Sequence, residues 1–378
     1  MIVVLIVFLA VVTTLWLSIF GYLLLIAALA TRRQAQPPEL STHPEIAVVV
    51  PTLNEERLIR TKLEDLRRTD YPRERMAVVV VDGGSTDGTE TIVRRQIDDG
   101  EAIQLISVPD SRGQADQLGR ALAQLTQPIV VITDADATLE PRCIRELVKV
   151  LAHDRETAIV GAQVQPATAL LEERLYWRCL NRLWWLEGEA LASALVSGVC
   201  YAIRREAVAP NCRAARAFDI HVAMAATAAG FRARLCPAAR ALEVRAPRAL
   251  REFVQVRRQR GLGYLAELWS VRARRGGGLR WQVARGVRLW HFLVTPALVA
   301  TAAASGAILL ATPYWRWPAA ALAAMIAPLL LAAGAAGTVT SPGRWWRISL
   351  AAARLPGLIF LALVAINRSP AARPAAGE

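Results

Sequence analysis

Two stretches of sequence decide the fold: VVVVDGGSTDG at residues 78–88 and IVVITDAD at residues 129–136. In each stretch a run of β-branched residues ends at a carboxylate, Asp82 in the first and Asp134 in the second. An apolar run of this length, bounded by Gly and Asp, is typical of a strand buried on both faces of a parallel sheet. Ligands of open α/β sheets bind outside the carboxyl ends of such strands, so we expect the two carboxylates to share one crevice.

Short apolar runs alternate with amphipathic stretches through residues 44–245. This alternation predicts an α/β domain of the Rossmann-like kind, in which helices cover a mixed, mostly parallel sheet. The five cysteines are scattered without CxxC spacing. A disulfide framework or a zinc site is therefore not expected, which fits a reducing, cytoplasmic environment.

The composition indicates a hybrid of soluble and membrane segments, with 54% hydrophobic residues, 20% charged residues and a mean hydropathy of +0.30. Residues 1–30 carry no charged side chain, and about 20 residues suffice to cross a hydrocarbon core. A cleavable signal would have basic residues before its apolar core, whereas Arg32 and Arg33 follow it. We interpret residues 1–30 as a retained transmembrane anchor whose Arg32 end is cytoplasmic.

Apolar segments return at residues 289–311, 317–339 and 348–366. They predict about three further transmembrane helices within residues 289–367, followed by a tail at 368–378. If all four segments cross, the C-terminus lies opposite the soluble domain. The basic tail argues against that topology, so the alternative is that one segment is re-entrant or interfacial.

The net charge of +13 arises largely from arginines in residues 246–288, directly before the second apolar region. We expect basic amphipathic or interfacial helices there, because positive-inside bias explains the excess charge. No nucleic-acid-reading motif accompanies the basic run, so nucleic acid is not an expected partner. The segment 171–195 is rich in Trp, including Trp184 and Trp185, and two interpretations stay open. It is either a helix at the membrane interface or in the core, or a wall of an acceptor site.

Asp134 and Asp136 are two carboxylates two residues apart after a predicted buried strand. Such a pair can offer oxygen ligands to one hard divalent ion that bridges phosphate oxygens. A solvated turn is the alternative for this pair. The Gly-rich turn after Asp82 lets backbone N–H groups approach a ligand, and a helix cap by Ser85 or Asp87 is compatible with that role.

Three motifs in order, VVVPTLNEE at 48–56, DGGSTDGT at 82–89 and DAD at 134–136, resemble a membrane-bound family 2 glycosyltransferase with the GT-A fold. The resemblance continues through SGVCYAIRR at 197–205 and FDIH at 218–221. It implies an inverting, metal-dependent enzyme, with Asp219 as the general base and with Asp134 and Asp136 holding Mg²⁺ or Mn²⁺. It also implies donor binding by Pro51, Thr52, Asn54, Glu55, Asp82 and Asp134, and an acceptor side at Gly198, Trp184 and Trp185.

This chain departs from the family pattern in three places. Phe218 stands where a Glu is usual and His221 where an acidic residue is usual, and Gln114 replaces a Lys after Gly113. The stretch QVRRQ at 255–259 resembles the family's QxxRW element with Gln259 in place of Trp. The resemblance implies donor binding by Gln255 and Arg258. Arg257 and Arg260 are the other arginines that could bind phosphate here. The alternative to the catalytic interpretation is a juxtamembrane basic helix bound to anionic lipid.

The resemblance implies a UDP- or GDP-sugar donor and a lipid or lipid-linked acceptor. The expected location is a membrane, the bacterial inner membrane, with the catalytic domain on its cytoplasmic side. The missing Trp of the QxxRW element makes single-sugar transfer the leading expectation. A processive polysaccharide synthase and a non-catalytic scaffold of the same fold are the alternatives.

Overall fold

The computed structural model describes residues 1–30, 37–207, 215–271 and 278–335. Eight strands form one sheet: β1 (Ile46–Thr52), β2 (Met76–Asp82), β3 (Ile103–Ser107), β4 (Ile129–Thr133), β5 (Ala137–Leu139), β6 (Thr157–Pro166), β7 (Cys200–Arg204) and β8 (Arg232–Glu243). The helices of this α/β part are α3 (Ile59–Arg67), α4 (Thr89–Asp98), α5 (Gln114–Gln124), α6 (Cys143–His153), α7 (Leu171–Leu191), α8 (Phe218–Ala228) and α9 (Leu250–Ser270).

The strands follow the order β3-β2-β1-β4-β7-β6-β8-β5. The pairs β2–β3, β1–β2, β1–β4 and β6–β8 are parallel, whereas β7 runs antiparallel to both β4 and β6, and β5 runs antiparallel to β8. The predicted mixed, mostly parallel sheet is therefore confirmed. The two predicted carboxylate-bearing strands, β2 and β4, lie on either side of β1.

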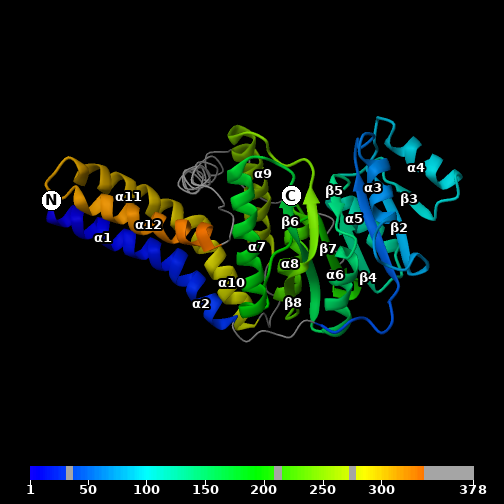
Figure 1. Cartoon of the computed structure of the whole chain (residues 1–378), viewed down its shortest axis with the longest axis horizontal. Coiled ribbons are helices and arrows are strands. Elements are labelled where there is room, and N and C mark those ends of the chain that lie inside the picture. Colours follow the sequence, from blue (N-terminus) through cyan, green and yellow to red (C-terminus); the bar gives the residue numbers. More distant parts are fainter. Residues whose placement is uncertain (31–36, 208–214, 272–277, 336–378) are drawn as a thin grey trace, which may run out of the picture.

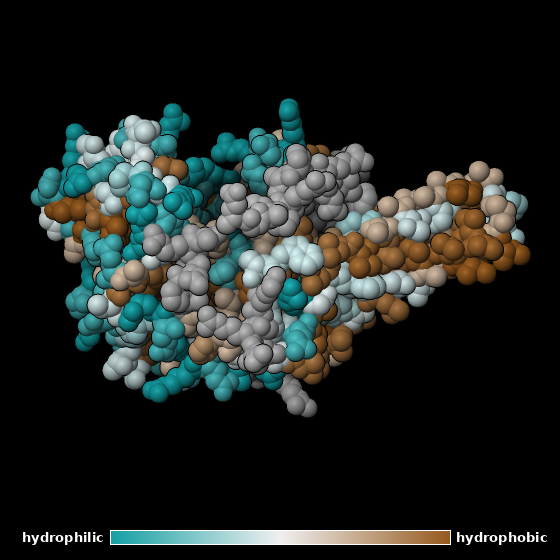
Figure 2. Space-filling model, turned by 180° about the vertical axis from the view of Figure 1, so that it is seen from behind, coloured by the Kyte–Doolittle hydropathy of each residue, from teal (hydrophilic) through white to brown (hydrophobic). Residues whose placement is uncertain are grey.

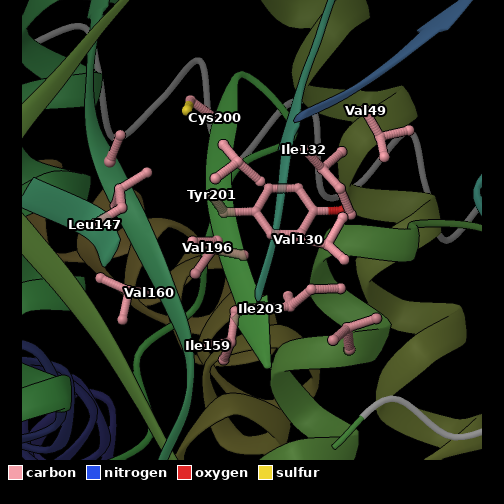
Figure 3. Close-up of a cluster of buried hydrophobic side chains, with 14 of the residues drawn as sticks. Val49, Val130, Ile132, Leu147, Ile159, Val160, Val196, Cys200, Tyr201 and Ile203 are labelled. Atoms are coloured by element: carbon pink, nitrogen blue, oxygen red, sulfur yellow. The ribbon is translucent and has the colours of Figure 1, made fainter. Parts of the chain in front are cut away.

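The core lies between this sheet and its helices, and β1 and β4 are buried along their whole length. Tyr201 of β7 reaches across the core among branched side chains that include Ile132 and Val130 (Figure 3). Parallel register aligns Val49 with both Val79 and Ile132, so the three strands end at one edge of the sheet. Asp82 and Asp134 therefore lie at the same edge of the sheet, and that they share one crevice stays a prediction.

A buried lysine supports the turn that carries Asp134 and Asp136. The Nζ of Lys62, on α3, donates to Thr133 Oγ1 at 2.9 Å and to the Ala137 carbonyl at 2.7 Å. Asp65, one turn later, accepts from the Leu139 N–H at 3.0 Å and lies 3.6 Å from Lys62. Burial lowers the pKa of Lys62 and raises that of Asp65, and the ion pair opposes both shifts.

The remaining helices form an elongated bundle that projects from the α/β part (Figure 1). They are α1 (Ile2–Trp16), the π-helical segment η1 (Leu17–Gly21), α2 (Tyr22–Leu29), α10 (Leu279–Leu289), the π-helical segment η5 (Trp290–Val294), α11 (Thr295–Leu310) and α12 (Arg316–Ala335). In the bundle α1 packs on α11 and α11 on α12, while α2 packs on α7. The surface of the projecting part is strongly hydrophobic, in contrast to the hydrophilic surface of the α/β part (Figure 2).

Two continuous helices in the described part of the chain, Ile2–Leu29 and Leu279–Leu310, are long and apolar enough to cross a membrane. The first spans 28 residues, about 42 Å at 1.5 Å per residue. The predicted segment 289–311 falls within the second of these helices. The predicted segment 317–339 is described only as far as the end of α12, and 348–366 and the tail 368–378 lie outside the described residues.

We expect Lys62→Met to lower the free energy of unfolding by about 3 kcal/mol or more, because it leaves the buried Asp65 carboxylate without its cation. Thermal unfolding in detergent or nanodiscs measures the change. Arg60→Met is the matched control, because Arg60 lies on the same helix with an exposed side chain. Equal effects of the two substitutions would contradict a supporting role for Lys62.

Candidate active site

The loop after β1 is fastened to the turn after β2 by side chain to backbone hydrogen bonds. The Asn54 N–H donates to Ser85 Oγ at 2.9 Å, and the Thr86 N–H donates to Asn54 Oδ1 at 2.9 Å. Asn54 has a φ of 57°, a left-handed conformation that Asn tolerates better than most residues. The Glu55 N–H donates to Thr89 Oγ1 at 2.8 Å, which fixes the end of the loop. Asn54 and Glu55, predicted to bind the donor, are thereby held next to the Gly-rich turn.

Asp82 is 1% exposed and its oxygens are engaged inside its own turn. Oδ2 accepts from the N–H groups of Gly84 at 3.0 Å and Ser85 at 2.8 Å, and Oδ1 accepts from Ser85 Oγ at 2.5 Å and Thr52 Oγ1 at 3.3 Å. Gly84 is required here, because its φ is +87° and a Cβ would lie 2.9 Å from the Pro109 carbonyl oxygen. Asp87, one residue before the N-cap Gly88 of α4, accepts from the Thr89 N–H at 3.0 Å. Contact of Asp82 with a nucleotide stays a prediction.

Asp134 and Asp219 approach each other around Gly198. The Gly198 N–H donates to Asp219 Oδ2 at 2.8 Å, and a Cβ at Gly198 would lie 3.2 Å from Asp134 Oδ2. The Ile220 N–H holds the other oxygen of Asp219 at 2.9 Å. Gly198 comes from the segment before β7 and Asp219 from the first turn of α8, so the antiparallel strand β7 brings the predicted base to the end of β4.

Burial and crowding change the protonation of these carboxyl groups. Burial, with the charges of Asp136 and Asp219, raises the pKa of Asp134 to about 7, although a hydrogen bond from Gln114 at 2.9 Å partly opposes the rise. Burial also raises the pKa of Asp219, against the two backbone N–H groups that stabilise its ionised form. A raised pKa makes each carboxylate a better proton acceptor than an ordinary surface aspartate.

Asp136 has a different partner, the guanidinium of Arg245. Arg245 Nε donates to Asp136 Oδ2 at 2.8 Å, and an Nη donates to Glu55. The pairing of β5 with β8 places Ala137 opposite Glu243, and the Val244 N–H donates to the Asp136 carbonyl at 2.9 Å. Arg245 therefore emerges from β8 beside the DAD turn because of the strand register.

A cavity of about 790 Å³ extends from Asp134 and Asp219 toward the helical bundle. Its walls near the carboxylates include Gly198, Gln114 and Tyr201. Its far walls come from the bundle and from the helices between the bundle and the sheet, namely η1 and α2 (Ile19, Tyr22, Leu23), α7 (Tyr176, Leu180, Leu183), α9 (Arg257, Arg260, Tyr264) and α10 with η5 (Val287, Arg288, Phe292). Beyond the carboxylates the walls thus combine apolar side chains with the arginines Arg257, Arg260 and Arg288.

The acidic pair has the chemistry of a Mg²⁺ or Mn²⁺ site. Asp134 and Asp136 repel each other, and this repulsion contributes to the raised pKa of Asp134. Among the described residues no cluster of three or more His, Cys, Asp and Glu side chains surrounds one position. Two carboxylates without further protein ligands suit an ion such as Mg²⁺, which is commonly held by one or two carboxylates, waters and substrate phosphates. The residues present therefore fit the predicted metal.

The structure separates some of the residues predicted to act together. Trp184 is 7% exposed and lines the cavity, whereas Trp185 lines a different groove between α6 and α7 and lies under Arg182, with 4.4 Å from the guanidinium carbon to the ring centroid. On α9, Gln255 and Arg258 are exposed and do not line the cavity. Their contact with a donor stays a prediction.

The arginines of α9 that face the cavity are Arg257 and Arg260, which are the predicted alternatives to Arg258 for binding phosphate. Arg257 is buried, pairs with Glu173 and stacks on Tyr176, with 3.9 Å from the guanidinium carbon to the ring centroid. Arg260 pairs with Glu243. The helical spacing of three residues between these arginines was a usable signal, because it places both on one side of a helix while Arg258 points elsewhere.

Models of two protein families match the chain. The model for glycosyl transferase family 2 matches residues 47–207, and that for glycosyl transferase family group 2 matches residues 129–336, more than half of the chain. Among solved structures, the chain is similar to the mannosyltransferase PcManGT from Pyrobaculum calidifontis in complex with GDP-Man and Mn²⁺. The TM-score is 0.72 and the identity 26%, covering 97% of this chain and 99% of that one.

Two relatives match a shorter part of this chain. The probable glycosyltransferase YdaM of Bacillus subtilis is 27% identical over 174 residues, which is 44% of this chain and 41% of that protein. The beta-monoglucosyldiacylglycerol synthase of Synechocystis sp. is 30% identical over 112 residues, 29% of this chain and 23% of that protein. The matched part of the chain thus spans less than half the length of either relative.

We expect Asp134→Asn to stabilise the metal-free protein at pH 8. The pKa of Asp134 is about 7 in the folded protein against an ordinary 3.8, so its ionised form disfavours folding above pH 7. This penalty shrinks as the pH falls below 7 and vanishes near the ordinary pKa, and the advantage of the variant should vanish with it. Thermal unfolding with chelator across this pH range measures the difference.

Asp98→Asn is the matched control for this series, because Asp98 lies on the exposed end of α4. If the difference in unfolding temperature between Asp134→Asn and the unsubstituted protein does not change with pH, the raised pKa of Asp134 is not its cause.

Proposed function

Because the chain belongs to glycosyltransferase family 2, we propose that it transfers one sugar, with inversion, from a nucleotide-sugar donor to a lipid or lipid-linked acceptor at the cytoplasmic face of a membrane. The observation that carries the acceptor class is the cavity described above. It joins Asp134 and Asp219 to apolar walls on Ile19 and Leu23 of the first long apolar helix. An acceptor hydroxyl placed at the carboxylates would have its apolar part beside the helices of the bundle.

The donor is proposed to be a UDP- or GDP-sugar. PcManGT, which matches nearly the whole chain, was solved with GDP-Man and Mn²⁺. In this chain the Asn54 loop and the Gly-rich turn after Asp82 form one connected rim beside the DAD turn. Arg245 contacts both Glu55 of this rim and Asp136, so a nucleotide bound at the rim would have its diphosphate next to the Asp134–Asp136 pair.

Asp219 is proposed as the general base. Its carboxylate is oriented by the N–H groups of Gly198 and Ile220, and burial raises its pKa, which favours proton uptake. The acceptor hydroxyl would give its proton to Asp219 as its oxygen bonds to the anomeric carbon. The bond from that carbon to the phosphate oxygen breaks at the same time, and the nucleoside diphosphate leaves. A single displacement of this kind inverts the anomeric centre.

Asp134 and Asp136 would hold Mg²⁺ or Mn²⁺, which when bound offsets negative charge on the departing diphosphate. His221, at a departure from the family pattern, takes another role. Its Nδ1 lies 2.7 Å from Glu267 Oε2, and Glu267 also accepts from the Arg216 N–H at 2.7 Å. His221 thus ties α8 to α9 and leaves Asp219 to its backbone partners.

Of the two alternative functions, a non-catalytic scaffold has no need of an oriented base. Two N–H donors aimed at Asp219 favour a working enzyme. A processive synthase would need a platform for a growing polymer at the cavity, where this chain has Gln259. Single-sugar transfer is therefore the proposed reaction.

We expect purified protein in lipid nanodiscs to release nucleoside diphosphate from one UDP- or GDP-sugar, and added membrane lipid extract to increase that release. Chelation should abolish it, and Asp219→Asn should lower turnover by about 10²-fold or more while leaving donor binding unchanged. Coupled detection of the diphosphate measures the rate, and isothermal titration measures donor binding. Exposed Asp98→Asn serves as the charge-matched control. Donor binding without lipid-dependent release would point to the scaffold instead.

We expect Leu23→Trp to fill part of the cavity and to reduce transfer to a lipid acceptor at least several-fold, with little effect on donor binding. Leu23 lines the cavity on α2, whereas Leu25 on the same helix is 57% exposed and faces outward. Leu25→Trp is thus the control of equal size. If both substitutions impair transfer equally, the cavity is not the path of the acceptor.

A further inference from the structure

We propose that Arg245 is the resident counter-cation of the metal site: it neutralises Asp136 when no divalent ion is bound and competes with the ion for that carboxylate. The inference rests on the proposed function only in taking Asp134 and Asp136 as the metal ligands. Arg245 donates through Nε to Asp136 at 2.8 Å and through an Nη to Glu55. One guanidinium therefore bridges the DAD turn and the nucleotide loop.

The charge balance of the site leaves Asp136 dependent on this arginine. Asp134, Asp136, Asp219 and Glu55 bring four carboxyl groups to one edge of the sheet. Of the nearby cations, Arg260 acts on Asp134 and Asp219 from a distance and is itself paired with Glu243. Lys62 lies beneath the turn, where its Nζ donates to Thr133 and Ala137. Among the described residues, the cation in direct contact with Asp136 is Arg245.

The strand register holds the backbone of Arg245 at this place, and the side chain keeps freedom to move. The β5–β8 pairing and the Val244 N–H bond to the Asp136 carbonyl fix the main chain. The Arg245 side chain is 54% exposed, against 19% for Asp136 and 13% for Glu55. Ion pairs as exposed as this contribute only about 0–1 kcal/mol, so a divalent ion shared with Asp134 can displace the guanidinium from Asp136.

The ion pair with Glu55 retains the guanidinium of Arg245 when it is displaced from Asp136. When an ion takes Asp136, the Glu55 contact keeps Arg245 at the rim of the nucleotide loop. Metal binding at Asp136 would leave Glu55 as the remaining partner of Arg245. The contact through which Arg245 connects the DAD turn to the nucleotide loop would then be broken. Loading of the metal and positioning of the nucleotide loop are coupled through this single side chain.

The test is Mn²⁺ affinity of the nucleotide-free, full-length protein in nanodiscs of neutral lipid, measured by electron paramagnetic resonance of free Mn²⁺. We expect Arg245→Ala to tighten Mn²⁺ binding by about threefold to fivefold, because it removes the competing cation. Arg245→Lys, which keeps the charge but loses the two-pronged contact, should fall between. Unchanged or weaker Mn²⁺ binding by Arg245→Ala overturns the proposal and makes Arg245 a positioning group for Asp136.

Arg240→Ala is the matched control, because Arg240 lies on β8 five residues before Arg245 and pairs with Glu140 on the surface, 3.7 Å away. It should change Mn²⁺ affinity by less than about twofold, since exposed charges farther away are screened by salt. An equal effect of both alanine variants would mean that net charge alone is responsible, which also overturns the proposal.

A second measurement separates this inference from the proposed transferase activity. In an Asp136→Asn background, Arg245→Ala should no longer tighten Mn²⁺ binding, because the contested carboxylate is gone. A protein that shows this pattern but no sugar transfer would refute the proposed function alone. A protein that transfers sugar, yet binds Mn²⁺ equally with and without Arg245, would refute the counter-cation alone.

Discussion

The parallel register of β1, β2 and β4 is the constraint on which the site depends. These strands are hydrogen-bonded side by side in parallel, with β1 and β4 buried along their whole length and β2 buried over its last four residues. Their carboxyl ends therefore coincide, and the first polar residues after them appear at one edge. Asp82 is the last residue of β2, the Asn54 loop comes after β1, and Asp134 comes directly after β4.

Crowding carboxylates at one edge has an electrostatic cost, and the fold offsets it from several directions. Lys62 lies below the DAD turn, Gln114 donates to Asp134, and Arg245, just after β8, contacts Asp136. Even so, the pKa of Asp134 is raised to about 7. Burial is the larger cause of this rise and the neighbouring carboxylates add to it, and a bound divalent cation would offset both.

The wall of the cavity depends on a polar cluster where the bundle meets the α/β part. The Tyr22 hydroxyl of α2 donates to Glu187 of α7 at 2.8 Å, and Arg288 of α10 donates to the other oxygen of Glu187 at 3.1 Å. Arg288 also donates to the Ser193 carbonyl. Removing one partner of a buried ion pair is strongly destabilising, because the other charge is left buried without a counter-ion. The cluster therefore holds α2, α7 and α10 in one arrangement. That arrangement places the first apolar helix against the cavity.

The sequence by itself determined the strands that end at Asp82 and before Asp134, the mostly parallel sheet and the family, because buried β-branched runs and Gly-Asp turns are local patterns with few structural solutions. It also indicated the acidic pair Asp134–Asp136 and the residue Asp219. Only the tertiary structure decided which side chains meet them. Arg245 reaches Asp136 through a pairing across more than one hundred residues, and Trp184 lines the cavity while its neighbour Trp185 does not. Such contacts depend on strand register and on helix rotation about the axis, and both are set by packing between distant segments.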